Sequence, residues 1–237
     1  MDLPHPLFEG RLVKRYKRFL ADVELAGGEV VTAHCPNPGS MMGLREPGLK
    51  VWLSKSDNPK RKLAHTLELM EIEGRLVGIH TGRPNGIVAE SIAAGRVPEL
   101  SGYATLRGEV KYGTNSRIDI LLEDPARGLC YVEVKNVHLA RPDGPNPGAA
   151  EFPDSVTARG AKHLEELSGM VADGHRAVMM FCVQRMDCDR FTTAADIDPT
   201  YDAALRKAQA AGVELLCRVC DITLDRISLE HPIPIVL

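Results

Sequence analysis

The 237-residue sequence lacks most features that would assign it to a specialised class of protein. Its first residues, Met1 to Pro6, have neither a basic start nor an apolar core, so we expect no signal peptide. No uninterrupted apolar run approaches the ~20 residues of a membrane span, and we therefore expect no membrane partner. Repeats and low-complexity segments are also absent. These absences favour an ordinary globular protein of the cytoplasm.

Cysteine and net charge are low as well. Six cysteines without an export signal are typical of reduced thiols in a cytoplasmic protein. Cys217 and Cys220 form a lone CxxC in a strand-like run, where positions three apart point to opposite faces, so a shared zinc ion or a redox role is the weaker interpretation. A net charge of -3 does not by itself indicate a nucleic-acid partner, although residues 1–80 are slightly basic.

The pattern of the chain changes near residue 82. Residues 1–82 contain short strand-like runs with frequent turns, which is typical of a small β-barrel. Residues 83–237 mix helical and strand-like runs, which predicts an α/β (mixed α+β) domain with a mixed sheet flanked by helices. Expected helices cover 85–95, 155–172 and 199–211, and expected strands cover 10–16, 19–25, 30–33, 50–54, 66–72, 75–79, 106–112, 118–122, 129–134, 176–183 and 213–220. The Pro/Gly-rich segment 141–153 predicts a loop without regular structure.

Two acids stand in neighbouring strand-like runs. The turn-rich stretch Asp124 to Gly128 joins these runs, and a hairpin centred on Ala126 would place Asp119 opposite Glu133. Directly opposed residues have Cβ atoms about 4.5–5.5 Å apart, and like charges there are destabilising. Such a pair needs a counter-ion, and carboxylate oxygens suit Mg²⁺ or Mn²⁺.

The residues after Glu133 extend this hypothesis. Glu133 and Lys135 project from one face of the strand, while the carbonyl of Val134 lies near the acids as a further metal ligand. Lys135 could orient a water molecule or offset charge on a phosphate, which is the equipment of metal-assisted phosphodiester hydrolysis. The alternative is a neutral surface patch, because Arg117 would face Lys135 in the same register and the four charges could pair diagonally.

Basic residues cluster in the first domain. The segment 11–19 contains five Lys and Arg residues, no acid and two interleaved aromatic residues, and 60–62 is a second cluster in a loop. Cations and rings are what nucleic-acid surfaces use, although two solvated charged stretches are the alternative. The candidate contacts to nucleic acid are Arg15, Lys17, Arg18, Lys60, Arg61 and Lys62.

Further candidates come from loops and helices. The loop from Cys35 to Gly43, which includes Asn37, could receive a phosphate on its backbone amides, or be a turn set by its prolines and glycines. Arg159 and His163 lie early in an expected helix, where they could bind a phosphate or form a polar face. Glu90 lies on the first expected helix and could reach the metal as a third acid, or be an ordinary helix glutamate.

With these residues in hand, the chain resembles the sugar fermentation stimulation protein A family over nearly its full length. The residues that carry the resemblance are the segments 15–23, 34–37, 56–58, 60–62, 99–103, 109–113, 116–119, 131–135 and 152–154. The resemblance implies an OB-fold over residues 1–82, a PD-(D/E)xK nuclease-like domain over 83–237, DNA binding, and a link to the use of sugars, maltose in particular.

The resemblance also implies roles for single residues. Asp119 matches the first acid of the nuclease motif, Glu133 and Lys135 its ExK pair, and Glu90 the helical acid. Ile118 stands where a proline usually precedes the first acid, and this departure removes no ligand. Three functions remain open: a nuclease dependent on Mg²⁺ or Mn²⁺, a non-catalytic DNA-binding regulator of sugar-fermentation genes, and an enzyme acting on a small phosphorylated metabolite. The expected partner is DNA or another nucleic acid, and homodimer formation is left open.

Overall fold

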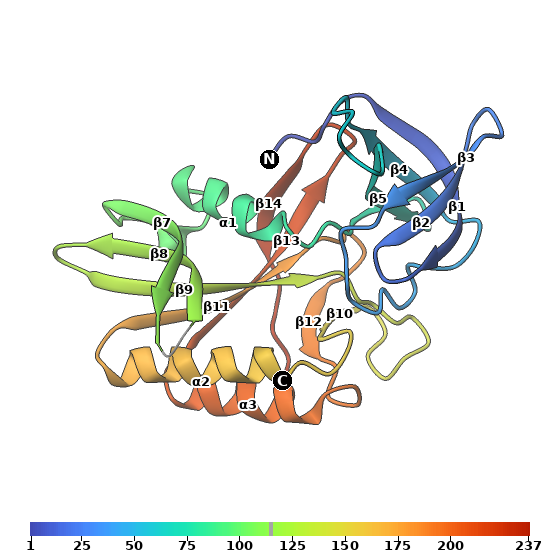
Figure 1. Ribbon diagram of the computed structural model, residues 1–237. Coiled ribbons are helices and arrows are strands. Elements are labelled where there is room, and N and C mark those ends of the chain that lie inside the picture. Colours follow the sequence, from blue (N-terminus) through green and yellow to red (C-terminus); the bar gives the residue numbers. More distant parts are fainter. Residues whose placement is uncertain (114–115) are drawn as a thin grey trace.

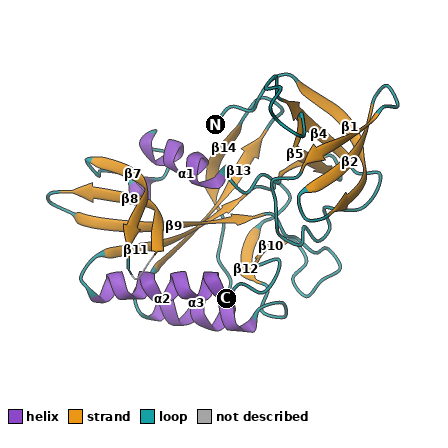
Figure 2. Ribbon diagram, viewed as in Figure 1, coloured by secondary structure: helices purple, strands orange, loops and turns teal. Residues whose placement is uncertain are grey.

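The computed structural model describes residues 1–113 and 116–237, and it contains two lobes (Figures 1 and 2). The strands of the first lobe are β1 (Leu7–Tyr16), β2 (Leu20–Leu25), β3 (Val30–His34), β4 (Lys50–Lys55), β5 (His65–Ile72) and β6 (Arg75–Gly78). They follow the order β3-β2-β1-β4-β5-β6, and a parallel pairing of β3 with β5 closes the sheet into a barrel. Alternate residues such as Val23, Leu53 and Leu67 fill the interior. The barrel confirms the expected OB-fold.

The second lobe is built on a mixed six-stranded sheet in the order β14-β13-β11-β9-β8-β7. The strands β9, β11 and β13 run parallel, whereas β7, β8 and β14 join the edges in antiparallel pairings. The strands of this sheet are β7 (Thr105–Tyr112), β8 (Ser116–Asp124), β9 (Gly128–Val137), β11 (Arg176–Val183), β13 (Glu214–Ile222) and β14 (Ile227–Pro232). The helices are α1 (Pro84–Ala93), α2 (Ala158–Ala172) and α3 (Pro199–Ala210), with a short 3₁₀ turn at Pro98–Leu100. This arrangement confirms the predicted mixed sheet flanked by helices.

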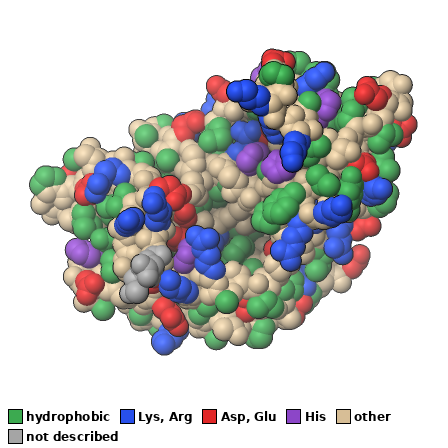
Figure 3. All heavy atoms as spheres, in the orientation of Figure 1, with side chains coloured by type: hydrophobic (Ala, Val, Ile, Leu, Met, Phe, Trp, Pro, Cys, Tyr) green, Lys and Arg blue, Asp and Glu red, His purple; other side chains and the backbone are tan. Residues whose placement is uncertain are grey.

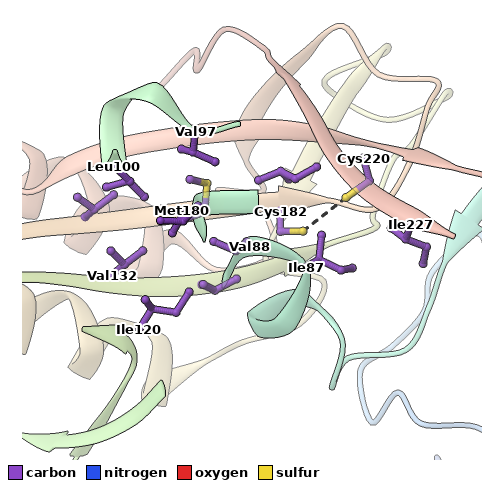
Figure 4. Packing of buried hydrophobic residues seen from close by; sticks show 14 of the residues in the cluster. Ile87, Val88, Val97, Leu100, Ile120, Val132, Met180, Cys182, Cys220 and Ile227 are labelled. Atoms are coloured by element: carbon purple, nitrogen blue, oxygen red, sulfur yellow. Dashed lines mark hydrogen bonds between the residues drawn. The ribbon is translucent and has the colours of Figure 1, made fainter. Parts of the chain in front are cut away.

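Helices cover both faces of the sheet (Figure 2). On one face, Ile87 and Val88 of α1 pack against strand residues that include Val132 and Met180 (Figure 4). On the other face, α2 and α3 pack together through Leu164, Leu167 and other apolar residues. The two faces explain why the central strands are almost continuously apolar, as strands buried on both sides are.

The lobes share apolar contacts. Trp52 and Leu69 on the outside of the barrel belong to the same buried cluster as Ile87 of α1. The first residues of the chain also pack in this cluster. Leu3 is buried in it and donates its backbone N–H to the Asp225 carbonyl (2.8 Å). The segment before β1 thus lies against the start of β14 and not against the barrel alone (Figure 1).

Several short elements differ from expectation. The segment predicted to be an irregular loop contains β10 (Ala149–Phe152), which pairs in parallel with β12 (Arg190–Thr193), so that part of the prediction was wrong. The edge strand β14 was also not expected. Cys217 and Cys220 do lie on opposite faces of β13, in the two different apolar clusters, and Cys220 contacts Cys182 at 3.6 Å (Figure 4). No helix among the described residues is both long enough and apolar enough to cross a membrane.

Candidate active site

The hairpin of β8 and β9 has the predicted register. Its paired residues include Ile120 with Val132 and Asp124 with Gly128, so the hairpin is centred on Ala126. The Asp124 carboxylate holds the turn, because its Oδ1 accepts the backbone N–H groups of Ala126 (2.9 Å) and Arg127 (3.0 Å). The paired part of the hairpin ends at Ile120 and Val132, and Asp119 and Glu133 are the next residues beyond it on the two strands.

Asp119 is held by two donors. Its Oδ2 accepts the backbone N–H of Val134 at 2.7 Å, and its Oδ1 accepts the side-chain amide of Asn85, from the first turn of α1, at 2.8 Å. Burial and the nearby Glu133 carboxylate nevertheless raise the pKa of Asp119. The N–H and C=O of one residue point to the same side of an extended strand, so the Val134 carbonyl also faces β8.

Glu133 is almost completely buried, with 2% of its surface exposed. Its Oε1 accepts a hydrogen bond from Lys135 Nζ at 2.7 Å and another from His163 Nδ1. Burial opposes ionisation most strongly, but these two partners prevail and lower the pKa of Glu133. Its second oxygen, Oε2, is buried without a hydrogen-bond partner among the described residues.

His163 reaches Glu133 from the first half of α2. Thr157 begins this helix, since its Oγ1 accepts the N–H of Gly160 (3.1 Å), and Asp198 in turn accepts the N–H of Thr157 (2.7 Å). Arg159 Nε donates to His163 Nε2 at 3.2 Å. Because Nε2 is thereby an acceptor, Nδ1 is the nitrogen that carries the proton donated to Glu133.

Two predicted roles on helices require correction. His163 is buried and bonded to Glu133, so it positions that carboxylate and does not present itself to a phosphate. Glu90 is not brought to the acid pair, because its carboxylate binds the N-terminal ammonium (2.8 Å) and Arg96 (3.5 Å). The helix α1 contacts Asp119 through Asn85 instead. The helical acid was therefore placed on the wrong residue, since the packing of Met1 beside α1 engages Glu90 elsewhere.

The charges at the hairpin do not form the exposed neutral patch considered as an alternative. Glu133 is buried, and the ammonium of Lys135, whose side chain is only 13% exposed, lies on Glu133 Oε1. Arg117 is exposed on β8, and its guanidinium donates to the Glu109 carbonyl at 3.4 Å. The pairing is therefore concentrated on the buried Glu133 and not spread diagonally over the surface.

A divalent cation fits this pair of acids. Glu133 Oε2 is an acceptor without a donor among the described residues, and burial together with the nearby Glu133 carboxylate raises the pKa of Asp119. Among residues 1–113 and 116–237, no group of three or more His, Cys, Asp and Glu side chains is arranged to hold a metal on its own. Mg²⁺ sites commonly use one or two carboxylates and complete their coordination with water and substrate phosphates. Asp119, Glu133 and the Val134 carbonyl meet that requirement.

Two polar residues beside this site were missed by the sequence analysis. Glu166 of α2 has a side chain only 10% exposed, and Lys162 Nζ lies 3.5 Å from its Oε1. Burial, together with the carboxylates of Glu133, Glu166 and Asp119, raises the pKa of the Tyr112 hydroxyl. The spacing of His163 and Glu166, three apart on one helix face, was the signal that could have indicated a second polar residue here.

The basic residues of the barrel divide into exposed and internal groups. Lys17, Arg18 and the cluster 60–62 are exposed, as a nucleic-acid contact requires. Lys and Arg side chains gather over the barrel on one face of the molecule, and a second group lies over β7, β8 and α2 (Figure 3). Arg159 is also exposed, at the start of α2.

Arg15 and Asn37 belong to the structure of the barrel. Arg15 Nη2 donates to the carbonyls of Arg18, Asn37 and Gly39 at 2.8–2.9 Å. Asn37 is fully buried, with its amide donating to the Ile79 carbonyl (3.0 Å) and accepting the N–H of Gly39 (2.9 Å). The predicted contact of Asn37 with nucleic acid was therefore wrong, and Arg15 acts chiefly as a brace between two turns.

The loop from Cys35 to Gly43 accommodates a carboxylate of the second lobe. Asp154 Oδ2 accepts the N–H of Met41 (3.1 Å), and Ser40 Oγ donates to the Asp154 carbonyl (2.8 Å). His138 Nε2 lies 3.6 Å from the same carboxylate oxygen. The anion bound by this loop is therefore the Asp154 carboxylate of the chain itself. This contact joins the two lobes.

The fold and the site together define a class of protein: an OB-fold barrel joined to a mixed α/β sheet with a buried glutamate and a half-buried aspartate on adjacent strands. Residues 13–79 match the family model described as the SfsA N-terminal OB domain, and residues 82–226 match that of the sugar fermentation stimulation protein RE domain. The chain belongs to the sugar fermentation stimulation protein family.

Relatives match the chain over its whole length. A protein of Rhodospirillum centenum named sugar fermentation stimulation protein homolog is 61% identical over 98% of this chain and 97% of its own. A protein of Maricaulis maris with the same name is 56% identical over 100% of this chain and 99% of its own. The solved structure of Pyrococcus furiosus SfsA in complex with Ca²⁺ is 25% identical, with a TM-score of 0.87 over 100% of this chain and 98% of that one.

Proposed function

We propose that this protein is a nuclease of the PD-(D/E)xK type that hydrolyses phosphodiesters of DNA or a related nucleic acid with Mg²⁺ or Mn²⁺. The observation that carries the proposal is the set of Asp119, Lys135 and the buried Glu133 on adjacent strands, in which Glu133 Oε2 has no donor among the described residues. The Ca²⁺ bound by the related Pyrococcus furiosus protein supports a divalent cation in this fold.

Each residue of the set has a role in this proposal. Asp119, Glu133 and the Val134 carbonyl hold the cation, which supplies a Lewis acid for the phosphoryl oxygen when it is bound. Lys135 orients the attacking water and offsets charge on the phosphate. To do so, its ammonium gives up part of its contact with Glu133 and contacts the substrate instead. His163, fixed by Arg159, keeps Glu133 ionised and in place. The exposed cations Lys17, Arg18, Lys60, Arg61, Lys62 and Arg159 bind the phosphate backbone.

The test is cleavage by the purified protein. Labelled single-stranded, duplex and branched DNA and RNA are incubated with Mg²⁺, Mn²⁺ or EDTA, and the products are separated by size. The proposal predicts products from at least one substrate with metal, none with EDTA, and none from Asp119→Ala. Hydrolysis that persists unchanged in Asp119→Ala would reject it.

A second function is favoured by one specific observation. The Lys135 ammonium lies 2.7 Å from Glu133 Oε1, so an internal ion pair already satisfies part of the charge that a metal would neutralise. A non-catalytic DNA-binding protein that regulates sugar-fermentation genes would use the basic surface and keep the acid cluster for stability. Salt-sensitive DNA binding with no product from any substrate and metal would favour this function.

A further inference from the structure

A row of paired residues, of which His34, Thr66 and Ser54 are polar, crosses the outside of the barrel. The registers pair Leu20 with His34, His34 with Thr66, and Thr66 with Ser54, so this row spans β2, β3, β5 and β4. Paired residues of a ladder lie on the same face of a sheet. Their neighbours Ala33, Leu53 and Leu67 fill the interior, and the row therefore lies outside.

A basic pocket opens on this row. Its walls include His34, Lys55, Arg61 and His80. Arg61 is oriented by a hydrogen bond from its Nη2 to Thr66 Oγ1 at 2.9 Å. The pocket therefore presents two cations, Lys55 from β4 and Arg61 from the loop after it, with the His34 ring beside them.

The acid in this pocket is already neutralised. Glu68 is 3% exposed, and its Oε2 accepts from Arg83 at 2.6 Å while its Oε1 accepts from Ser54 Oγ at 2.7 Å. Lys55 and Arg61, which are both exposed, therefore set the charge that an entering ligand meets. Such a pocket favours an anion, and phosphate is the anion that fits a pair of cations with hydroxyl groups beside them.

An exposed aromatic ring continues the wall of this pocket. Phe19 is 48% exposed in the turn directly before β2, and its ring stacks on that of His34 with centroids 6.4 Å apart and an interplanar angle of 19°. The backbone under the ring is fixed, since the Phe19 carbonyl accepts the N–H of Cys35 at 2.8 Å. A large apolar ring held in solvent next to a cationic pocket has the geometry of a stacking platform.

The residues before Phe19 supply further charge at some conformational cost. Lys17 and Arg18 have φ values of 48° and 60°, in the left-handed region that favours glycine or asparagine. Both are exposed in the turn between β1 and β2. Two exposed cations in a strained backbone conformation thus directly precede the ring in the chain.

From this arrangement we infer that the barrel binds an unpaired nucleotide, with its base on the Phe19–His34 stack and its phosphate between Lys55 and Arg61. The inference rests on the proposed action on nucleic acid and adds the substrate class, a single-stranded segment. Bases in a duplex already stack on their neighbours, so an exposed ring gains contact only with a base that is unpaired.

The test compares single-stranded and duplex DNA by fluorescence anisotropy in EDTA, with labelled oligo(dT) and a duplex of equal length. Stacking contributes on the order of 1–3 kcal/mol per base, so Phe19→Ala weakens oligo(dT) binding by about 5-fold or more and duplex binding by less than about 2-fold. Val30→Ala is the matched control, because Val30 is 56% exposed on the same barrel, and it leaves both affinities unchanged. Circular dichroism melting verifies that each variant is folded.

Charge in the pocket is tested separately. Arg61→Ala reduces the slope of log K against log salt for oligo(dT) by about 0.7, the value for one phosphate contact with a single strand. Arg75→Ala, an exposed arginine of β6, leaves that slope unchanged. Equal losses for duplex and single strand in Phe19→Ala, or none, would overturn the inference. Because the binding assay contains EDTA, its result does not depend on whether the protein cleaves nucleic acid. If the protein cleaves but Phe19→Ala does not change binding, the single-strand site is rejected and the proposed nuclease function is not.

Discussion

The carboxylate of Asp119 accepts the backbone N–H of Val134 at 2.7 Å, which ties the first acid of the site to the strand that carries the second. The same contact turns the Asp119 carboxylate toward β9 and draws Asn85 of α1 into the site. Asp119 and Glu133 lie one residue beyond the paired part of β8 and β9, so the main chain of the hairpin brings them close together. Changes to these side chains should therefore alter chemistry more than fold.

Removal of Asp119 or Lys135 should abolish cleavage and preserve binding. We expect Asp119→Ala and Lys135→Ala each to lower kcat by about 100-fold or more, as loss of one group that stabilises transition-state charge does. The Kd for DNA, measured in EDTA, should change by less than about 3-fold, because the exposed cations on the barrel and on α2 are intact. Glu90→Gln is the control, since this exposed carboxylate pairs with Met1 and Arg96, and it should cleave at the wild-type rate.

Removal of His163 should destabilise the protein. In His163→Ala, Glu133 retains only the Lys135 hydrogen bond to Oε1, and we expect a loss of about 1–3 kcal/mol in the free energy of unfolding. Urea unfolding measures this loss. Arg159→Ala removes only an exposed guanidinium and should cost less than about 1 kcal/mol. Equal stability of His163→Ala and the wild type would show that the contact with Glu133 contributes nothing.

The junction of the lobes should lose stability in acid. Burial opposes ionisation of Asp154, but His138, the Met41 N–H and Ser155 prevail and lower its pKa from 3.8 to about 2. The folded protein thus binds this proton less readily than the unfolded chain. The contribution, about 2 kcal/mol, is complete above the ordinary pKa and disappears as pH falls from about 4 to 2.

The variant Asp154→Asn isolates this contribution. Its stability deficit against the wild type, measured by urea unfolding, should be largest at neutral pH and shrink toward pH 2. Asp189→Asn, at a side chain 78% exposed, should show no such pH dependence. A deficit that is constant from pH 7 to pH 2 would contradict the lowered pKa.

A change of sequence in the turn between β1 and β2 should raise the stability of the protein and weaken its binding to DNA. Replacing Lys17-Arg18 by Asn-Gly supplies residues that accept the left-handed conformation, and we expect stabilisation by about 1 kcal/mol or more. The same change removes two exposed cations, so DNA affinity should fall and its salt dependence should weaken. Thermal melting and anisotropy on one preparation measure both effects. A variant that gains stability and keeps full affinity would remove the turn from the binding surface.

The sequence was informative wherever local chemistry decides the structure. The turn residues around Ala126 and the alternating runs beside it determine the hairpin register, and the acid pair follows from that register. The barrel and the mixed sheet followed from strand length and turn spacing. The Pro/Gly-rich segment concealed β10, because a four-residue strand leaves too short a pattern to recognise.

Errors in the site came from contacts between distant segments. Whether Glu90 or Asn85 faces Asp119 depends on how α1 is rotated against the sheet, and the N-terminal residue that binds Glu90 is remote in sequence. Asn37 is buried because Ile79 and the second lobe close over its loop. His163 looked like a surface residue of a polar helix, and only the packing of α2 on β9 brings it to Glu133. Composition and residue spacing do not reveal how a helix is rotated against a sheet or which loop a distant segment covers.

The central claim is a divalent cation between Asp119 and Glu133. Crystals grown with Mn²⁺, with anomalous diffraction recorded above the manganese edge, test it most directly. The account predicts a peak about 2–2.5 Å from oxygens of both carboxylates and of the Val134 carbonyl, with the peak absent from crystals of Asp119→Asn. A wild-type map in which Lys135 keeps its contact with Glu133 and no anomalous peak lies beside either acid would contradict it.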